Sequence, residues 1–261
     1  MILDRLAASA RKRVEEKKRR RPLTELQREA EAMEKNTGFP FRQALEAEGI
    51  SFICEVKKAS PSKGIIAEQF PYLEIAEDYQ AAGAAAISVL TEPEYFLGQD
   101  RYLKEIARQA ALPVLRKDFT VDPYQIYEAK VLGASAVLLI CSILSLEQLK
   151  EYLKLARGLG LSALVETHDS REIDLALKAG AGIIGVNNRN LQDFQVDVSN
   201  SLRLRELIPP GVLYVSESGV RTRRDVEILE QNGTDGVLIG ETLMRSPDRQ
   251  RTLRELKGGA G

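Results

Sequence analysis

The apolar residues of this 261-residue chain gather in short runs, and four of these runs share one local pattern. In each of the four, a helix-like segment leads to a glycine, then to small residues, and then to the apolar run. A glycine suits the left-handed backbone position just past a helix end. An unbroken apolar run is typical of a parallel strand that is buried on both faces. The pattern therefore predicts four helix-to-strand units, at residues 81–90, 131–140, 178–187 and 231–240.

Four further apolar runs alternate with these along the chain, at residues 52–58, 112–118, 161–167 and 211–217. The eight runs end near residues 57, 90, 117, 141, 166, 187, 217 and 240. Such spacings suit a strand, a helix and two loops, so we predict an α/β protein, a single (β/α)8 TIM barrel. An open doubly wound sheet is the alternative. It usually has fewer strands and often carries a G-x-G-x-x-G fingerprint, which follows no strand here.

Helix signals fill the segments between the predicted strands. Residues 72–82, 146–159 and 170–179 read as helices. Ser145 and Ser170 stand at the start of the last two, and a serine hydroxyl there can accept a hydrogen bond from a free backbone N–H group. We therefore predict both serines as N-caps.

Residues 1–50 precede the first repeat and are strongly charged; their run RKRVEEKKRRR holds eight basic and two acidic residues. We interpret them as a helical extension packed on the barrel, with residues 51–261 as the catalytic barrel domain. A nucleic-acid-binding arm is the alternative, but no aromatic residues are interleaved with the basic ones. The extension enters the barrel directly before the first strand, so we expect it to lie over the open end and help close the site. Because the repeats are complete without residues 1–45, the barrel is expected to fold without them.

Composition narrows the classes of partner. Lys and Arg total 37 and Asp and Glu total 38, a net charge of −1, so neither nucleic acid nor an anionic membrane is expected to bind. No apolar run reaches the roughly 18 residues that a membrane span needs. The N-terminus has the reverse order of a secretory signal. We therefore expect a cytoplasmic protein.

The cysteines and the histidine are too few for a metal site. Cys54 and Cys141, the only cysteines, lie inside apolar runs and are predicted to be buried, reduced thiols. His168 is the only histidine, and a zinc site normally needs several His or Cys ligands. No metal is expected, and we expect His168 on the surface or in a loop, although a catalytic base is the alternative.

Polar side chains stand at the ends of the apolar runs, and for any one of them a solvated strand end would be explanation enough. In a barrel, alternate strand residues point inward, and active sites form at the carboxyl ends of the strands. Glu55 and Lys57 share the inward face of the first strand. Other strands end in, or are closely followed by, Lys117, Glu166, Asn187, Arg189 and Glu217. Because five strands converge on these side chains, we predict an active site there.

Two glycine-containing loops follow the last two strands. Ser218 and Gly219 come after the seventh strand, and Gly240 and Glu241 after the eighth. In this fold, backbone N–H groups of these loops commonly bind a phosphate group. Either glycine alone could be a turn residue, but together they predict a phosphate site. A carboxylate beside a phosphate would repel it, so we expect Glu241 to contribute only its backbone N–H.

The motifs FICEVKKASPSKG, LPVLRKDF, LVETHD, GVNNRNL, VSESG and VLIGETLM, in this order, resemble those of the indole-3-glycerol phosphate synthase family of tryptophan biosynthesis. The resemblance covers almost the whole chain, including the charged N-terminal helices. It implies a carboxy-lyase that closes the indole ring of 1-(2-carboxyphenylamino)-1-deoxyribulose 5-phosphate, with loss of carbon dioxide and water. It also implies that neither a cofactor nor a metal is used.

The same resemblance implies roles for the candidate residues. Lys117 is expected to be the general acid for the substrate ketone, and Glu166 its partner in proton transfer and charge stabilisation. Lys57 would hold the anthranilate carboxylate and take part in dehydration. Glu55 and Glu217 would orient the lysines and substrate hydroxyls, and Asn187 and Arg189 would complete the polar rim. Phe96 and Phe119 would flank the aromatic ring. The phosphate would be held by Ser60, Ser218, Gly219, Gly240 and the Glu241 backbone.

Two other functions compete with this interpretation. A barrel isomerase such as phosphoribosylanthranilate isomerase needs one acid–base pair, and the pairing of Glu55 with Lys57 argues against it. A sensor that binds a phosphorylated ligand without catalysis would not need Lys57, Lys117 and Glu166 together. A phosphorylated small molecule is the expected partner, and the chain is expected to be a monomer.

Overall fold

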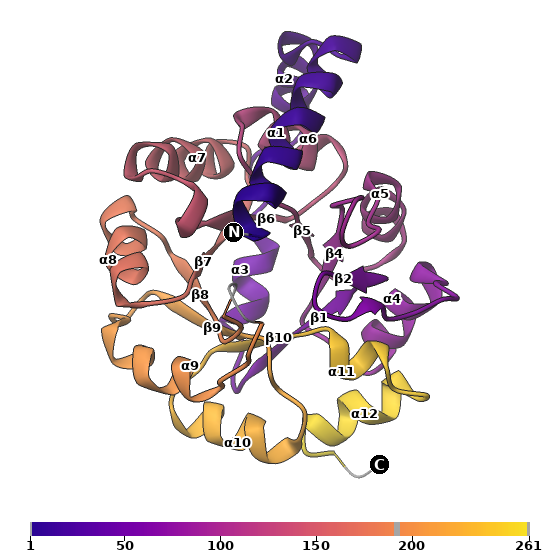
Figure 1. Cartoon of the computed structure of the whole chain (residues 1–261), viewed down its shortest axis with the longest axis vertical. Coiled ribbons are helices and arrows are strands. Elements are labelled where there is room, and N and C mark those ends of the chain that lie inside the picture. The colour runs from indigo at the N-terminus through magenta and orange to yellow at the C-terminus, as the bar shows by residue number, and fades with distance from the viewer. Residues whose placement is uncertain (1, 191–193, 260–261) are drawn as a thin grey trace.

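Within residues 2–190 and 194–259, which the computed structural model describes, eight parallel strands close into a barrel (Figure 1). Around the barrel the order is β1-β10-β9-β8-β7-β6-β5-β4, so the last strand pairs with the first. The strands are β1 Ser51–Val56, β4 Ala86–Leu90, β5 Val114–Lys117, β6 Ala136–Ile140, β7 Ser162–Thr167, β8 Ile183–Asn187, β9 Leu213–Glu217 and β10 Gly236–Ile239. The predicted (β/α)8 barrel is confirmed, and each predicted strand end lies within one residue of the observed end.

Helices cover the outside of the barrel, as Figure 1 shows. They are α4 Tyr72–Ala81, α5 Asp100–Gln109, α6 Pro123–Val131, α7 Leu146–Gly158, α8 Ser170–Ala179, α9 Ser199–Leu204, α10 Arg223–Gln231, α11 Glu241–Met244 and α12 Arg249–Leu256, with short 3-10 turns η1 Cys141–Ile143 and η2 Arg205–Leu207. In the loop after β1, the short strands β2 Ala59–Ser60 and β3 Gly64–Ile65 form a hairpin. The predicted left-handed glycines are confirmed, with φ of 79° at Gly83, 89° at Gly133, 86° at Gly180 and 75° at Gly233.

One predicted helix cap is confirmed and the other is wrong by one residue. The Ser145 hydroxyl accepts a hydrogen bond from the Gln148 N–H at 3.2 Å and starts α7. At the start of α8, the cap is Asp169, whose carboxylate accepts from the N–H groups of Arg171 and Glu172, both at 2.9 Å. A carboxylate also interacts favourably with the positive end of the helix dipole, which explains why Asp169 caps the helix in place of Ser170.

The apolar residues form two layers, one inside the barrel and one between the strands and the helices. Ile53, Leu115, Leu138 and Leu164 belong to the buried cluster that fills the barrel. The larger cluster packs the outward faces of the strands against the helices. Both cysteines are buried, as predicted, and Cys54 belongs to the outer layer.

The N-terminal extension touches both ends of the barrel. Its helices are α1 Ile2–Arg20, α2 Leu23–Ala32 and α3 Pro40–Leu45. In Figure 1 the N-terminus lies over the barrel opening, and α1 runs outward from there toward α6, on which α2 packs. Helix α3 instead brings Phe41 and Leu45, both fully buried, into the cluster that fills the barrel. The barrel interior is therefore not complete without α3, contrary to the expectation that residues 1–45 are dispensable for it.

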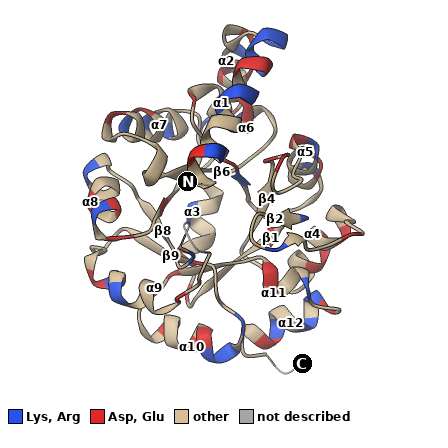
Figure 2. Cartoon of the chain, viewed as in Figure 1, with Lys and Arg blue, Asp and Glu red and all other residues tan. Residues whose placement is uncertain are grey.

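Charged residues of both signs are distributed over the outer helices (Figure 2). This mixture agrees with the near-zero net charge of the sequence. No helix within the described ranges is long and apolar enough to span a membrane. The described part also contains no cluster of three or more His, Cys, Asp or Glu side chains arranged to hold a metal ion.

Candidate active site

A cavity of about 410 Å³ opens at the carboxyl ends of the barrel strands. All fourteen residues that the sequence singles out line it: Glu55, Lys57, Ser60, Phe96, Lys117, Phe119, Glu166, Asn187, Arg189, Glu217, Ser218, Gly219, Gly240 and Glu241. They come from seven of the eight barrel strands and the loops that follow them, so only closure of the barrel brings them together. The floor of the cavity is the upper layer of the barrel interior, including Leu138 and Leu238.

Lys117 lies at the centre of the polar side of the cavity. Its Nζ is 3.1 Å from Glu166 Oε2, to which it donates a hydrogen bond, and 3.5 Å from Glu217 Oε2. Burial alone would lower the pKa of Lys117, but the negative charges of Glu166, Glu217 and Glu55 outweigh it and raise that pKa above its usual value. Lys117 therefore carries its proton at neutral pH and can deliver it as an acid.

The two carboxylates beside Lys117 have opposite properties. Burial tends to raise the pKa of Glu166, yet the charges of Lys117 and His168 overcome it, and this pKa lies below its usual value. Burial raises the pKa of Glu217 to about 7, because the charges of Lys117 and His168 do not compensate for burial and for the nearby Glu166 and Glu55. The cluster thus holds one ionised carboxylate and one carboxyl group that titrates near neutrality.

Gly185 on β8 makes room for Glu217. A Cβ atom at this position would lie 2.2 Å from Glu217 Oε1, well inside contact distance. Glu217 Oε1 is itself buried without a hydrogen-bond partner among the described residues. A glycine within a strand often marks such a close approach, so Gly185 is a site-shaping residue that the sequence analysis missed.

Glu55 and Lys57 form a second ion pair across the cavity from Glu166, at the end of β1. Both side chains approach Gly240: a Cβ atom there would lie 2.3 Å from Glu55 Oε1 and 2.9 Å from Lys57 Nζ. The φ of Gly240 is −121°, which any residue can adopt. Gly240 is therefore needed for space, and the pair of Glu55 and Lys57 occupies that space.

The loops after β8, β9 and β10 form the cationic end of the cavity. Ser218 and Gly219 have φ of 68° and 99°, and a Cβ atom on Gly219 would lie 2.7 Å from both Val196 and Val198. The Glu241 carboxylate pairs with three cations: Arg245 at 3.3 Å, Lys63 at 3.5 Å and Arg189 at 3.8 Å. These ion pairs hold the Glu241 carboxylate, and they agree with a phosphate site in which Glu241 contributes only its backbone N–H.

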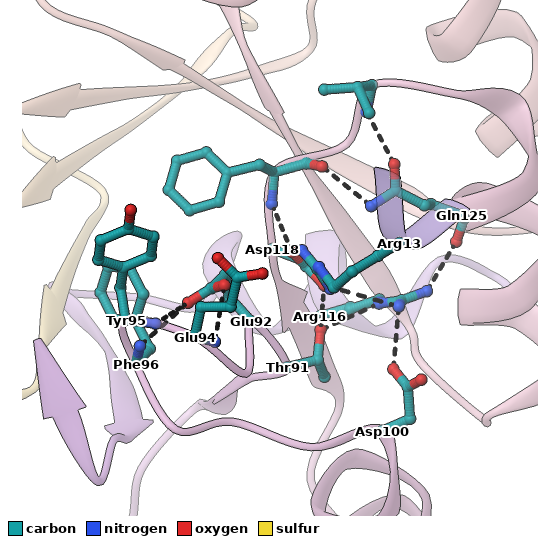
Figure 3. A network of polar contacts seen from close by, with 12 residues as sticks. Arg13, Thr91, Glu92, Glu94, Tyr95, Phe96, Asp100, Arg116, Asp118 and Gln125 are labelled. Atoms are coloured by element: carbon teal, nitrogen blue, oxygen red, sulfur yellow. Dashed lines mark hydrogen bonds and ion pairs between the residues drawn. The ribbon is translucent and has the colours of Figure 1, made fainter. Parts of the chain in front are cut away.

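The side of the cavity away from this cationic end is apolar. The rings of Phe96 and Phe119 lie with their centroids 6.2 Å apart. The loop that carries Phe96 is fixed by the buried Glu92, whose carboxylate accepts hydrogen bonds from three successive backbone N–H groups, as Figure 3 shows. Helix α1 adds Ile2, Leu3 and Leu6 to the lining.

A charged network supports Lys117 from behind. Arg116 and Asp118 flank it in sequence, and their side chains turn away from the cavity into the network of Figure 3. The Arg116 guanidinium contacts Glu128 at 2.7 Å and Asp100 at 3.0 Å. The Asp118 carboxylate contacts Arg13 at 2.8 Å. Because Arg13 belongs to α1, the network ties the N-terminal helix to the strand that carries Lys117.

Several cavity residues escaped the sequence analysis. Arg221 and Arg245 line the cationic end. The available signal was position: Arg221 follows Gly219 by two residues, and Arg245 stands one helical turn after Glu241. The three apolar residues of α1 gave no signal, because their place in the cavity depends on how the helix crosses the barrel.

His168 is a further correction. The sequence predicts a histidine on the surface or in a loop; His168 does lie in the loop between β7 and α8, but only 17% of its side chain is exposed. It follows β7, with Nε2 3.5 Å from Glu166 Oε1 and Nδ1 3.0 Å from Glu172 Oε2. Glu172 in the first turn of α8 and Ser142 in η1 both contact the imidazole ring, which the local sequence does not reveal.

Comparisons with known proteins give a consistent result. The family model described as indole-3-glycerol phosphate synthase matches residues 3–256. A protein of Ruminiclostridium cellulolyticum with that name is 56% identical over 260 residues, which are 100% of both chains. One of Endomicrobium trichonymphae with the same name is 55% identical over 257 residues, 98% of this chain and 100% of the relative.

Solved structures share the fold at low identity. The 3-hexulose-6-phosphate synthase of Salmonella typhimurium has a TM-score of 0.66 at 14% identity, covering 80% of this chain and 97% of that one. KGPDC from Streptococcus mutans has a TM-score of 0.64 at 12% identity, covering 81% and 97%. These two likenesses concern the barrel alone.

Proposed function

The chain belongs to the indole-3-glycerol phosphate synthase family, and from that premise we propose how its side chains divide the reaction among them. It is a carboxy-lyase of tryptophan biosynthesis that closes the indole ring of 1-(2-carboxyphenylamino)-1-deoxyribulose 5-phosphate. Neither the isomerase nor the sensor alternative is favoured, because the similar proteins carry the synthase name. The observation that supports the assignment of roles is the buried Lys117 between Glu166 and Glu217.

Ring closure is assigned to Lys117 and Glu166. The substituted aromatic carbon attacks the ketone carbon, the carbonyl oxygen gains electrons, and Lys117 delivers a proton to it. The attack leaves a positive charge on the ring and its nitrogen. The Glu166 carboxylate, ionised and out of water, stabilises that charge more strongly than solvent would. Loss of carbon dioxide then returns an electron pair to the ring.

Dehydration is assigned to the second pair and to Glu166. Lys57 first holds the substrate carboxylate as a counter-ion. After decarboxylation its ammonium group can protonate the departing hydroxyl, while a carboxylate removes the proton that restores the aromatic ring. Glu55 holds Lys57 in place, and its contact with that lysine supports this role. Glu217 and Asn187 orient Lys117 and the substrate hydroxyls.

Substrate binding is divided between the two ends of the cavity. Phe96 and Phe119 flank the anthranilate ring, which favours apolar contact on its faces. The phosphate binds to backbone N–H groups of Gly219, Gly240 and Glu241, and to Ser60 and Ser218. Arg189 adds a positive charge at the phosphate, and Arg221 and Arg245, which also line this end of the cavity, add two more. No cofactor or metal has a part in the proposed steps.

We also infer the organisation of the whole protein. Residues 51–261 form the barrel, and residues 1–50 form the extension, of which α1 covers the site and α3 completes the barrel interior. The protein acts as a cytoplasmic monomer on a small phosphorylated substrate. Size-exclusion chromatography with light scattering tests the monomer: a mass of 29.0 kDa is expected, and a stable dimer would contradict it.

One assay tests the proposed activity. Purified protein is mixed with the carboxyphenylamino ribulose phosphate, and indole formation is followed by fluorescence. The expected result is indole product at a rate that a metal chelator does not change. Isomerisation of phosphoribosylanthranilate in a parallel assay, without indole formation, would overturn the proposal in favour of the isomerase. Saturable binding of the substrate without turnover would favour the sensor.

A further inference from the structure

A chain of polar groups lies behind Glu166, on the side away from Lys117. Glu172, at the start of α8, contacts His168 twice: its Oε2 accepts the His168 backbone N–H at 2.8 Å and lies 3.0 Å from Nδ1. Its Oε1 accepts the Ser142 hydroxyl at 2.6 Å. The other ring nitrogen, Nε2, faces Glu166 Oε1 at 3.5 Å. Glu172, His168, Glu166 and Lys117 thus form one line of alternating charge.

We propose that His168 is a positioning residue for Glu166. Held by Glu172, its imidazolium fixes the Glu166 carboxylate toward Lys117 and keeps it ionised. The inference rests on the role proposed above for Glu166. It assigns to the only histidine of the chain a function that sequence analysis did not expect.

The contacts of the two ring nitrogens with carboxylates favour a charged ring. An ionised carboxylate only accepts hydrogen bonds, so Nδ1 must carry the hydrogen that points to Glu172. In a neutral ring, Nε2 would then present its lone pair to Glu166 Oε1, and two acceptors would face each other. Nε2 is buried and has no hydrogen-bond partner among the described residues, so water does not relieve that conflict. Only the doubly protonated ring suits both carboxylates.

The surrounding charges agree with this geometry. Three carboxylates face His168: Glu166 from β7, Glu172 from α8 and Glu217 from β9, while the Ser142 hydroxyl approaches from η1. Burial lowers the pKa of His168, but these partners outweigh it and raise the pKa above its usual value. In return, the His168 charge helps to lower the pKa of Glu166.

The function of Glu166 therefore depends on a charge at position 168. With the imidazolium present, Glu166 stays ionised at mildly acid pH and can stabilise the cationic intermediate. Replacing the ring by a neutral side chain removes one of the two cations that hold Glu166 ionised. Its pKa then rises, and a larger part of the enzyme is inactive at the acid end of the pH range.

The first test is an NMR titration of the whole protein. Because His168 is the only histidine, the imidazole carbon-bound protons give a single pair of signals that needs no assignment. The expected midpoint in the unmodified enzyme lies above the usual ~6.5 for histidine. Both Glu172→Gln and Glu166→Gln should lower it. A midpoint at or below ~6.5, or one that Glu166→Gln leaves unchanged, would overturn the inference.

The second test is kinetic. In His168→Gln, kcat/KM should fall roughly tenfold at the acid end of its pH profile while its plateau stays within about threefold of the parent enzyme. A purely structural role would instead lower kcat/KM equally at every pH, and that outcome would also overturn the proposal. Asp169→Asn is the matched control, since it removes a charge from the adjacent residue yet keeps a capping side chain.

The two tests separate this inference from the proposed function. The NMR titration concerns the imidazole and gives its answer whether or not Glu166 is catalytic. If Glu166→Gln retains full turnover while the titration behaves as expected, the role of Glu166 is wrong and the ion-pair line is real. If Glu166→Gln is inactive and the titration midpoint is ordinary, the role of Glu166 stands and the positioning by His168 is wrong.

Discussion

At the scale of single residues, three carboxylates surround one buried ammonium group. Glu166 and Glu217 both contact Lys117, and Glu55 adds a third negative charge nearby. Burial and the charges of Glu166 and Glu55 outweigh the opposing charges of Lys117 and His168, so Glu217, with a pKa of about 7, is the carboxyl group that most readily keeps its proton. The cluster can exchange protons near neutral pH, and it costs stability whenever Glu217 is charged.

Glu217→Gln should therefore stabilise the protein more at high pH than at low pH. Because burial raises the folded-state pKa to about 7, above the ~4.3 of an unfolded chain, the stability from this group is complete below ~4.3 and is lost as the pH rises through about 7. We expect the Tm difference between variant and parent to grow by roughly 2–4 °C from pH 5 to pH 8. An equal difference at both pH values in thermal unfolding would contradict this.

Gly240→Ala should impair substrate turnover and leave the fold intact. The added methyl group would meet Glu55 Oε1 and displace the pair of Glu55 and Lys57, while the backbone at φ −121° tolerates alanine. We expect kcat/KM to fall at least about tenfold, as for other misplaced catalytic groups. Gly158→Ala, where a Cβ atom meets nothing within 4 Å, is the matched control. Unchanged kinetics in Gly240→Ala would show that the space is not needed.

At the scale of elements, the strands could be predicted closely and the contacts around them could not. Buried parallel strands give unbroken apolar runs, and the polar residues at or beside the ends of these runs, such as Lys117 and Glu217, face the site. The sequence predicts that the extension lies over the open end, but which α1 residues line the cavity, the burial of His168 and the choice of Asp169 as a cap depend on packing between elements. Nothing in the local sequence fixes these, which is why the sequence analysis missed them.

The anchoring of α1 gives a prediction at this scale. Arg13→Met removes the closest cation of the buried Asp118, which keeps Arg116 only at 3.7 Å. We expect a loss of about 3 kcal/mol in the free energy of unfolding, the lower end of the range for a broken buried pair. Adding Asp118→Asn should recover part of it. Lys12→Met, at an exposed position of the same helix, is the control in urea denaturation. Equal stability of Arg13→Met and Lys12→Met would contradict the account.

At the scale of the whole molecule, the extension closes both ends of the barrel. Helix α1 contributes apolar lining to the cavity, and α3 places Phe41 and Leu45 in the barrel interior. At the carboxyl end of the strands the extension contributes to the substrate cavity, and at the other end it completes the apolar core. The extension has two functions, although the sequence treats it as one charged segment.

Two truncations separate these functions. Removal of residues 1–36 takes away α1 and α2 but keeps α3, so we expect a folded barrel with a raised KM, because the cavity loses its apolar cover. Removal of residues 1–45 also deletes Phe41 and Leu45, which should cost roughly 5 kcal/mol or more. Thermal unfolding and steady-state kinetics check both. Equal Tm values for the two truncations, or an unchanged KM in the shorter deletion, would refute this division.

The most direct test of the account is the turnover of Lys117→Met. If Lys117 is the acid for closure of the indole ring, kcat should fall by ~10²-fold or more in a variant that still folds. Lys58→Met is the matched control, because this neighbour of Lys57 does not line the cavity, and it should keep normal turnover. Near-normal indole formation by a folded Lys117→Met variant would contradict the central claim.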